Sequence, residues 1–130
     1  MDDMTAEEIA FAMERLFEAG AREVFTVPVG MKKSRPGTML EVLCTPDRRE
    51  ELLRTLFRHT TTLGVRETSV RRYALSRTEE TRQTPCGTVR RKRSTGWGVS
   101  REKDEYEDLA RIARERGVSL REARELAEQK

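Results

Sequence analysis

Residues 22–44 read REVFTVPVGMKKSRPGTMLEVLC, and the pattern in this stretch sets the architecture of the chain's first half. Residues 24–29 and 38–44 are rich in β-branched and apolar side chains, which predicts two strands. Residues 32–37 lie between them and end in Pro36-Gly37, a dipeptide typical of turns. We therefore predict a β-hairpin. Because Pro28 has no N–H to donate, its strand should lie at a sheet edge or contain a bulge.

Amphipathic helices are predicted on both sides of this hairpin. Thr5 and Glu8 form a capping box ahead of apolar residues at three- to four-residue spacing, and Gly20 ends that pattern. Thr45-Pro46 begins a second helix, because proline is well tolerated at the first helical position. The buried stripe of this second helix is expected to consist of Leu52, Leu53, Leu56 and Phe57.

The second half of the chain carries weaker patterns, which predict three extended segments. A strand is expected over residues 65–75, with one wet face because it carries several arginines. Two shorter extended pieces, residues 78–84 and 88–93, should flank the turn Pro85-Cys86-Gly87. Residues 94–100 place glycines on both sides of a tryptophan and predict a flexible connector.

The C-terminal part is predicted to be helical. A helix is expected over residues 102–116, ending at Gly117, and a last short helix should follow the capping box of Ser119 and Glu122. Hairpins and helices that do not alternate as βαβ units indicate an α+β fold. We predict a ferredoxin-like antiparallel or mixed sheet with helices on one face, plus C-terminal helices, with residues 1–130 as a single domain.

The composition predicts a thin core and a small anionic ligand. Charged residues make up 38% of the chain and hydrophobic residues 35%, whereas about 25% charged residues is typical of soluble proteins. We therefore expect a homo-oligomer, a trimer or a hexamer, that buries apolar surface between subunits. A net charge of +3 is too balanced for an obligate nucleic-acid binder, and the basic run at residues 90–93 lacks interleaved aromatic residues for base stacking.

The cysteines and the N-terminus predict a cytoplasmic protein. Cys44 and Cys86 lack CxxC spacing, and the first residues lack the pattern of a signal peptide. No apolar run approaches the roughly 18 residues that a membrane span needs. With His59 as the sole histidine, a structural zinc site is disfavoured, whereas a hard metal held by oxygen ligands is allowed.

The turn at residues 31–37 is the first candidate binding segment. Lys32, Lys33 and Arg35 place three cations on a loop with proline and glycine, and such loops bind phosphates through charge and backbone amides. The alternative is a solvated hairpin tip with no ligand.

Carboxylates and hydroxyls supply the other candidates. Asp2 and Asp3 can bind a divalent cation, or they can merely favour the positive end of the first helix. Thr61 and Thr62 can donate to phosphate or ribose, although threonines are also common where a helix ends. Tyr106, near the start of the third helix, can present its hydroxyl to a ligand. Further candidates for the metal are Glu105, Glu107 and Asp108.

Several segments together resemble one family, the CTP-dependent cyclometallase LarC, which inserts nickel in nickel-pincer nucleotide cofactor synthesis. They are Asp2-Asp3-Met4-Thr5, Met31-Lys32-Lys33-Ser34-Arg35-Pro36-Gly37, Thr60-Thr61-Thr62-Leu63-Gly64-Val65-Arg66, Thr84-Pro85-Cys86-Gly87 and Glu105-Tyr106-Glu107-Asp108. The resemblance covers nearly the whole chain, and the chain looks like the family's C-terminal domain, part of a longer protein.

The resemblance implies an enzyme that inserts nickel, its substrate metal, into pyridinium-3,5-bisthiocarboxylic acid mononucleotide while CTP is cleaved to CMP and pyrophosphate. It implies that Lys32, Lys33 and Arg35 contact the triphosphate of CTP, that Thr61 and Thr62 add hydroxyls, and that Asp2 and Asp3 bind Mg²⁺ or Mn²⁺. The resemblance names no catalytic residue in this chain. Because the family's histidine-rich N-terminal domain is not part of the chain, the isolated domain is not expected to have full activity. The alternative is a non-catalytic regulatory nucleotide-binding module on a ferredoxin-like oligomer.

Overall fold

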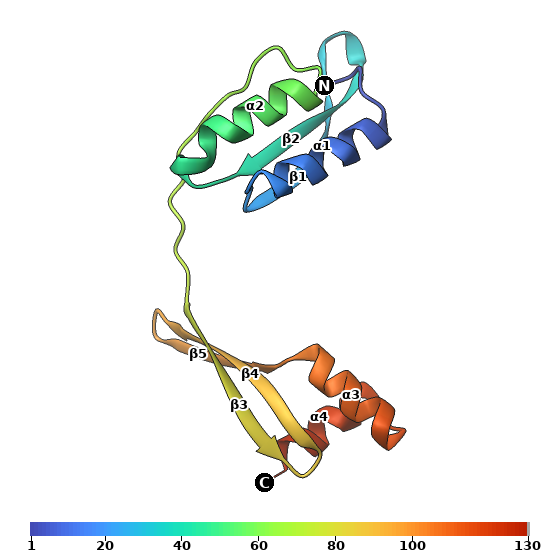
Figure 1. The fold of residues 1–130 in the computed structure, drawn as a ribbon, viewed down its shortest axis with the longest axis vertical. Helices are drawn as coiled ribbons and strands as arrows, with labels where there is room; N and C mark the ends of the chain where they lie inside the picture. Colours follow the sequence, from blue (N-terminus) through green and yellow to red (C-terminus); the bar gives the residue numbers. More distant parts are fainter. Residues whose placement is uncertain (130) are drawn as a thin grey trace. The chain divides into compact units, whose positions relative to one another are not determined.

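The computed structural model describes residues 1–129, which fall into two compact units (Figure 1). Unit 1 is Met1–Ser69 and unit 2 begins at Val70. The described residues contain two small antiparallel sheets and four helices, which confirms the predicted α+β class. Within residues 1–129, no helix has the length and the apolar character needed to cross a membrane. That residues 1–130 act as a single domain stays a prediction.

Unit 1 is a β-hairpin with two helices on one face. Its elements are α1 (Ala6–Glu18), β1 (Glu23–Gly30), β2 (Pro36–Leu43) and α2 (Arg49–His59), with short 3-10 turns at Lys32–Ser34 and Pro46–Arg48. The predicted hairpin and both helices are therefore confirmed. The core that joins helices and sheet is made of Leu16, Val24, Leu52 and Leu56, with Leu40 and Val42 packed against it.

The capping box that starts α1 is formed as the sequence predicts. The Thr5 hydroxyl accepts the Glu8 N–H at 3.2 Å, and the Glu8 carboxylate accepts the Thr5 N–H at 2.7 Å. Two backbone donors at the start of the helix are thereby satisfied. This cap fixes the point at which the N-terminal segment leaves the helix.

Pro28 lies at a sheet edge, as its missing N–H requires. It faces Thr38 across the hairpin, and Thr38 exchanges two backbone hydrogen bonds of 2.8 Å with Met1 on the other side of β2. In an antiparallel pair, a residue bonded to one neighbour turns both of its polar groups away from the other. The nitrogen of Pro28 therefore points away from β2, where no ladder bond is lost.

The second face of this hairpin carries apolar side chains that no helix of unit 1 covers. Alternation places Phe25 and Val27 on the face opposite to the core residue Val24, together with Met39 and Leu43 of the partner strand. Phe25, Met39 and Leu43 remain more than one third exposed. An apolar sheet face of this kind commonly packs against another chain.

Unit 2 is a three-stranded sheet with two helices on one face. Its elements are β3 (Ser76–Thr84), β4 (Gly87–Gly96), β5 (Val99–Asp104), α3 (Tyr106–Arg116) and α4 (Leu120–Glu128), and the strand order is β3-β4-β5 (Figure 1). The core contains Val89, Leu109, Ile112, Ala123 and Ala127. The turn at residues 85–86, the cap of α3 at Gly117 and the capping box of α4 agree with the sequence predictions.

Three sequence predictions in this half are wrong. Residues 65–75 form no strand in the structure, because within the described part of the chain they have no neighbouring strand to pair with, and Val70 and Tyr73 are largely exposed. The helix expected from residue 102 begins only at Tyr106, because residues 99–104 pair with β4 as strand β5. Residues 94–100 are no connector: positive φ at Trp97 and Gly98 closes the tight β4–β5 turn.

The ferredoxin-like topology stays a prediction. Unit 1 has the helix–strand–strand–helix order that forms the middle of a ferredoxin-like domain, but its sheet contains two strands. Unit 2 has a hairpin-rich order with both helices after the strands. The structure thus supports the α+β class, and the finer topology requires strands beyond those in unit 1.

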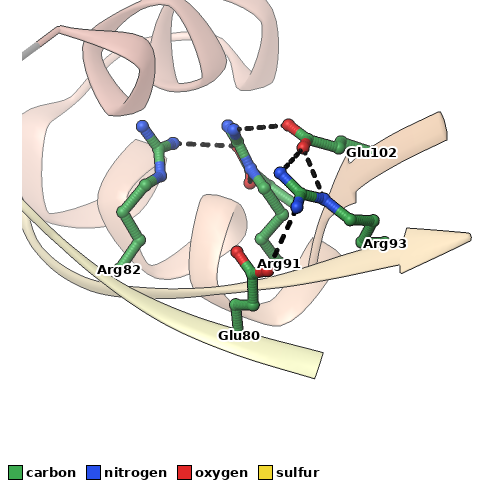
Figure 2. A network of polar contacts seen from close by, with 6 residues as sticks. Glu80, Arg82, Arg91, Arg93 and Glu102 are labelled. Carbon is green, nitrogen blue, oxygen red and sulfur yellow. Dashed lines mark hydrogen bonds and ion pairs between the residues drawn. The ribbon is translucent and has the colours of Figure 1, made fainter. Parts of the chain in front are cut away.

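An ion network centred on the buried Asp104 ties the three strands of unit 2 together. The Asp104 side chain is 4% exposed and accepts hydrogen bonds from Arg91 Nε at 2.7 Å and Arg82 Nη2 at 3.5 Å. Arg91 also bonds Glu102 at 3.0 Å, and Arg93 lies between Glu102 and Glu80 (Figure 2). The three arginines and the three carboxylates of this network neutralise one another. These polar side chains can therefore lie beside the apolar core.

Candidate functional site

The basic turn of unit 1 has an unusual backbone. Lys33 and Ser34 have φ values of 61° and 56°, which place two consecutive non-glycine residues in the left-handed region. The loop is closed by a 2.8 Å hydrogen bond that the Met31 N–H donates to the Arg35 carbonyl. Strained backbone of this kind is concentrated at binding sites. Lys32, Lys33 and Arg35 are all exposed on this turn, where an anion can reach them.

Gly37 lets the N-terminal segment lie against the turn. A Cβ atom on Gly37 would collide with Met31 Sδ and come within 3.1 Å of the Met1 carbonyl oxygen. Only glycine leaves the room for this close approach of two backbone segments. The pairing of Met1 with Thr38 then directs the next two residues, Asp2 and Asp3, past the basic turn.

Three segments that are distant in sequence meet at this point, and we call Asp2, Asp3, Arg35 and Thr61 the Asp–Arg–Thr cluster. Arg35 Nη1 lies 3.6 Å from Asp2 Oδ2. The Thr61 hydroxyl donates a 2.6 Å hydrogen bond to Asp3 Oδ1. The N-terminal carboxylates, the basic turn and the threonine segment therefore contribute to one surface of unit 1.

The other predicted binding residues, Thr62, Lys32, Lys33 and Tyr106, lie outside this cluster. Thr62 donates its hydroxyl to the Gly64 carbonyl at 2.8 Å, a local bond that shapes the chain after α2. Lys32 and Lys33 are neighbours of Arg35 on the exposed turn. Tyr106 is 56% exposed and belongs to unit 2, whereas all residues of the cluster belong to unit 1.

A cavity of about 320 Å³ adjoins the cluster, because both include Thr61. Its other lining residues are Met4, Glu8, Phe11, Arg58, His59 and Thr60. The rings of Phe11 and His59 meet edge to face, with centroids 5.7 Å apart. Aromatic walls with a few polar groups are typical of small-molecule sites. The sequence could not show that His59 lines this cavity, because its contact with Phe11 joins residues of two different helices.

The donor set of the cluster suits a hard divalent cation that arrives with phosphate. Among residues 1–129, no group of three or more histidine, cysteine or acidic side chains is placed to hold a metal ion. Mg²⁺ is usually held by one or two carboxylates, with phosphate oxygens and water completing its shell. Asp2 and Asp3 fit that pattern, and they do not fit a closed zinc site.

The reserve metal ligands in unit 2 are engaged with cations. Asp108 accepts the Arg90 backbone N–H at 2.8 Å and two bonds from the Arg90 guanidinium at 3.0 and 3.1 Å. These hydrogen bonds hold the pKa of Asp108 below its usual range. Glu105 forms an ion pair with Lys92. Both carboxylates therefore stabilise the join between β4 and α3, which weakens their case as metal ligands.

These features define a small α+β protein with a candidate nucleotide-phosphate site, and comparisons with known proteins give its family. The family model described as "Nickel insertion protein" matches residues 1–124. The pyridinium-3,5-bisthiocarboxylic acid mononucleotide nickel insertion proteins of Acetivibrio thermocellus and Alkaliphilus metalliredigens are each 40% identical over 120 residues, which cover 92% of this chain. The chain therefore belongs to the nickel insertion protein family, as its motifs predicted.

Solved structures agree with this assignment. The chain is similar to the apo C-terminal domain of a cyclometallase involved in the synthesis of the NPN cofactor of lactate racemase, with a TM-score of 0.80 and 35% identity over 98% of this chain and 88% of that one. A protein of Methanopyrus kandleri has a TM-score of 0.77 and 27% identity over 95% of this chain and 77% of that one. The chain spans under a third of the length of the curated relatives it matches.

Proposed function

We propose that this chain is the CTP-binding domain of a cyclometallase that inserts nickel into pyridinium-3,5-bisthiocarboxylic acid mononucleotide. The proposal is supported by the names of its relatives and by the similarity to a cyclometallase C-terminal domain. Nickel is a substrate of this reaction, and the mononucleotide is its acceptor. Because the chain corresponds to under a third of its relatives, the complete reaction needs the rest of the protein.

The observation that carries the proposal is the meeting of two carboxylates, one guanidinium group and one hydroxyl in the Asp–Arg–Thr cluster. In our proposal Lys32, Lys33 and Arg35 bind the triphosphate of CTP, while Thr61 and Thr62 turn their hydroxyls from local partners to phosphate or ribose. Lysine supplies a mobile point charge, and arginine a planar fork for two oxygens. The cavity beside Thr61, which Phe11 and His59 help to line, is the place where we expect the cytosine base.

Asp2 and Asp3 are proposed to hold Mg²⁺ or Mn²⁺ against the phosphates. A divalent cation at this point would neutralise negative charge on the triphosphate. CTP is cleaved as a water oxygen bonds to the α-phosphorus and the bond from that phosphorus to the oxygen bridging to the β-phosphate breaks. The water protons pass to solvent, CMP and pyrophosphate separate, and negative charge grows on the pyrophosphate. In this proposal the cations of the basic turn stabilise that charge. Tyr106 remains a candidate ligand contact from unit 2.

A regulatory nucleotide-binding module is the second candidate, because it would use the same cations. The two functions differ in whether the bound CTP is cleaved. Pyrophosphate should be released when the full-length protein of this family receives CTP, Mg²⁺, nickel and the pyridinium mononucleotide. Binding of CTP without release of pyrophosphate under these conditions would favour the regulatory module and contradict the enzymatic proposal.

We expect Lys33→Ala and Arg35→Ala each to weaken CTP binding while the fold is retained. Both side chains lie on an exposed turn, and each lost charge-assisted contact should cost about 1.5–3 kcal/mol, or roughly ten- to a hundredfold in affinity. Isothermal titration with Mg²⁺ and CTP measures this effect. Arg54→Ala is the matched control, because Arg54 is an exposed arginine on α2 that pairs only with Glu50 in the described residues. CTP affinity that is unchanged in both turn variants would show that the turn is a solvated tip.

We also expect the protein to form a homo-oligomer, a trimer or hexamer. The apolar face of the unit 1 hairpin is left open by the helices of that unit, and the β2 edge exchanges backbone hydrogen bonds with Met1 through Thr38. A strand added at a free edge of this hairpin would extend the sheet toward the predicted ferredoxin-like arrangement. Light scattering at micromolar concentration should therefore give a mass well above 15.1 kDa. A monomer would contradict this expectation.

A further inference from the structure

An exposed aromatic pair stands at one end of the unit 2 sheet. Tyr73 and Trp97 are 71% and 73% exposed, and their rings meet edge to face with centroids 5.7 Å apart. The two residues come from the segment that leads into β3 and from the β4–β5 turn. Aromatic rings of this size are seldom left so exposed without a partner. The pair is therefore available to stack on a flat ligand.

The backbone holds Trp97 at this position against its conformational preference. Trp97 has φ 52°, and it lies between Gly96 and Gly98 in a turn that normally takes asparagine, aspartate or glycine. A bulky aromatic residue at positive φ is a genuine outlier. Such strain persists where a side chain has a task at its position. The strain at Trp97 favours a binding role over a role as turn residue.

Cations lie next to this pair on the sheet face that the helices leave open. Val89 of β4 packs against the helices in the core of unit 2. Because side chains alternate along a strand, residues 91 and 93 share this covered face, and residues 94 and 96 belong to the opposite, open face. Arg77 and Arg101 both pair with Ser94, one from each side, and therefore share that open face. Both arginines are exposed, and none of the carboxylates in residues 1–129 pairs with them.

The spacing between aromatics and arginines suits one small ligand. The Arg77–Ser94–Arg101 row lies two residues from the Gly96–Val99 row, or roughly 6.5 Å along the strands. Gly96 has no side chain, and Leu75 and Val99 form an apolar floor beside it. An aromatic ring stacked at Trp97 and a phosphate held above Ser94 would then belong to a single mononucleotide.

We propose that Tyr73, Trp97, Arg77 and Arg101 form the docking site for the pyridinium mononucleotide substrate, separate from the CTP site of unit 1. This inference rests on the proposed function for the substrate's identity. A pyridinium ring is a flat cation, and indole is the best side-chain partner for a cation over its face. Two arginines match the phosphate of the same molecule through charge-assisted hydrogen bonds. Nucleotides with a neutral base would lack the cation contact.

The test uses nicotinamide mononucleotide, which combines a pyridinium cation with a phosphate. Because Trp97 is the only tryptophan of the chain, quenching of its fluorescence reports directly on this site. We expect saturable quenching by nicotinamide mononucleotide, and at least about fivefold weaker binding of nicotinamide riboside, which lacks the phosphate, and of CMP, which lacks the cation. Tighter binding of a short single-stranded RNA than of the mononucleotide would assign the surface to nucleic acid and overturn the proposal.

Separate substitutions test the aromatic part and the arginine part of this site. Trp97→Gly should fold normally, because glycine adopts positive φ without strain, and should weaken binding of the probe about tenfold by calorimetry. The double variant Arg77→Gln, Arg101→Gln should weaken it by at least about tenfold, whereas the control Arg121→Gln, an exposed arginine on α4, should leave it unchanged. CTP affinity should stay at the parent value in all of these variants. Probe affinity that is unaffected by both changes, with CTP binding intact, would overturn this inference and leave the proposed function standing.

Discussion

The Asp104→Asn variant is expected to lose about 3 kcal/mol of the stability of unit 2, more than a hundredfold in its folding equilibrium. Asp104 is the buried countercharge of Arg91 and Arg82, and asparagine would leave two guanidinium groups facing each other without it. Removal of one partner from a buried ion pair is costly because the remaining charge cannot regain its water. The expected loss of about 3 kcal/mol lies at the lower end of the range for broken buried ion pairs, because the Arg82 side chain is 30% exposed and keeps part of its water.

Hydrogen exchange measures this loss separately in unit 2, because the amides of β4 and β5 report on the strands that the network joins. Those amides should exchange faster in the Asp104→Asn variant, while amides of α1 and β1 in unit 1 keep their parent rates. Glu80→Gln is the matched control: Glu80 is half-exposed and pairs with Arg93 at 3.6 Å, so its loss should cost less than about 1 kcal/mol. Equal effects of both substitutions would show that the burial of Asp104 adds nothing to the pairing.

Local signals were sufficient for the first half of the fold. The unit 1 hairpin follows from β-branched residues on both sides of Pro36-Gly37, and α1 follows from a capping box that lies entirely within four residues. In these places the sequence neighbours of a residue are also its partners in space. Prediction therefore succeeded where the stabilising contacts are local.

The β5 strand could not be predicted in this way. Residues 99–104, VSREKD, contain charged residues that commonly occur in helices, and the helix expected from the sequence therefore starts at residue 102. Their partners lie across the sheet, where Glu102 pairs with Arg93 and Asp104 with Arg91. Cross-strand ion pairs thus outweigh helix propensity, and no local pattern shows which arginine a carboxylate will meet.

The candidate site, too, could be predicted only where its residues have local sequence signals. The motifs identified Asp2, Asp3, Arg35 and Thr61 separately, and the structure joins Asp3 to Thr61 across 58 positions of sequence. The cavity beside them was missed, because Phe11 and His59 come from different helices and neither has a local signature. Trp97 was interpreted as part of a connector, since its strained turn is visible only in the backbone angles.

Replacement of Asp2 and Asp3 by asparagine should abolish the enhancement of CTP binding by Mg²⁺, an expected loss of about a hundredfold or more in affinity with Mg²⁺ present. Asparagine keeps the size and the hydrogen-bonding capacity of each side chain, including an acceptor for the Thr61 hydroxyl, and removes the charge that a hard cation requires. Calorimetric titration of CTP with and without Mg²⁺ measures the enhancement directly in the parent and in the variant.

Two outcomes distinguish a metal site from a helix-start effect. If the aspartates only favour the positive end of α1, the double variant loses at most about 1–2 kcal/mol of stability and binds Mg²⁺–CTP as well as the parent. The control Glu7→Gln removes an acidic residue from the first turn of α1 outside the Asp–Arg–Thr cluster, so it should reproduce any dipole effect without changing the response to Mg²⁺. An enhancement by Mg²⁺ that survives in the double variant would place the cation elsewhere. Because Asp108 and Glu105 already bind Arg90 and Lys92, such a result would direct the search to Glu107, the candidate in the α3 start that forms no ion pair among the described residues.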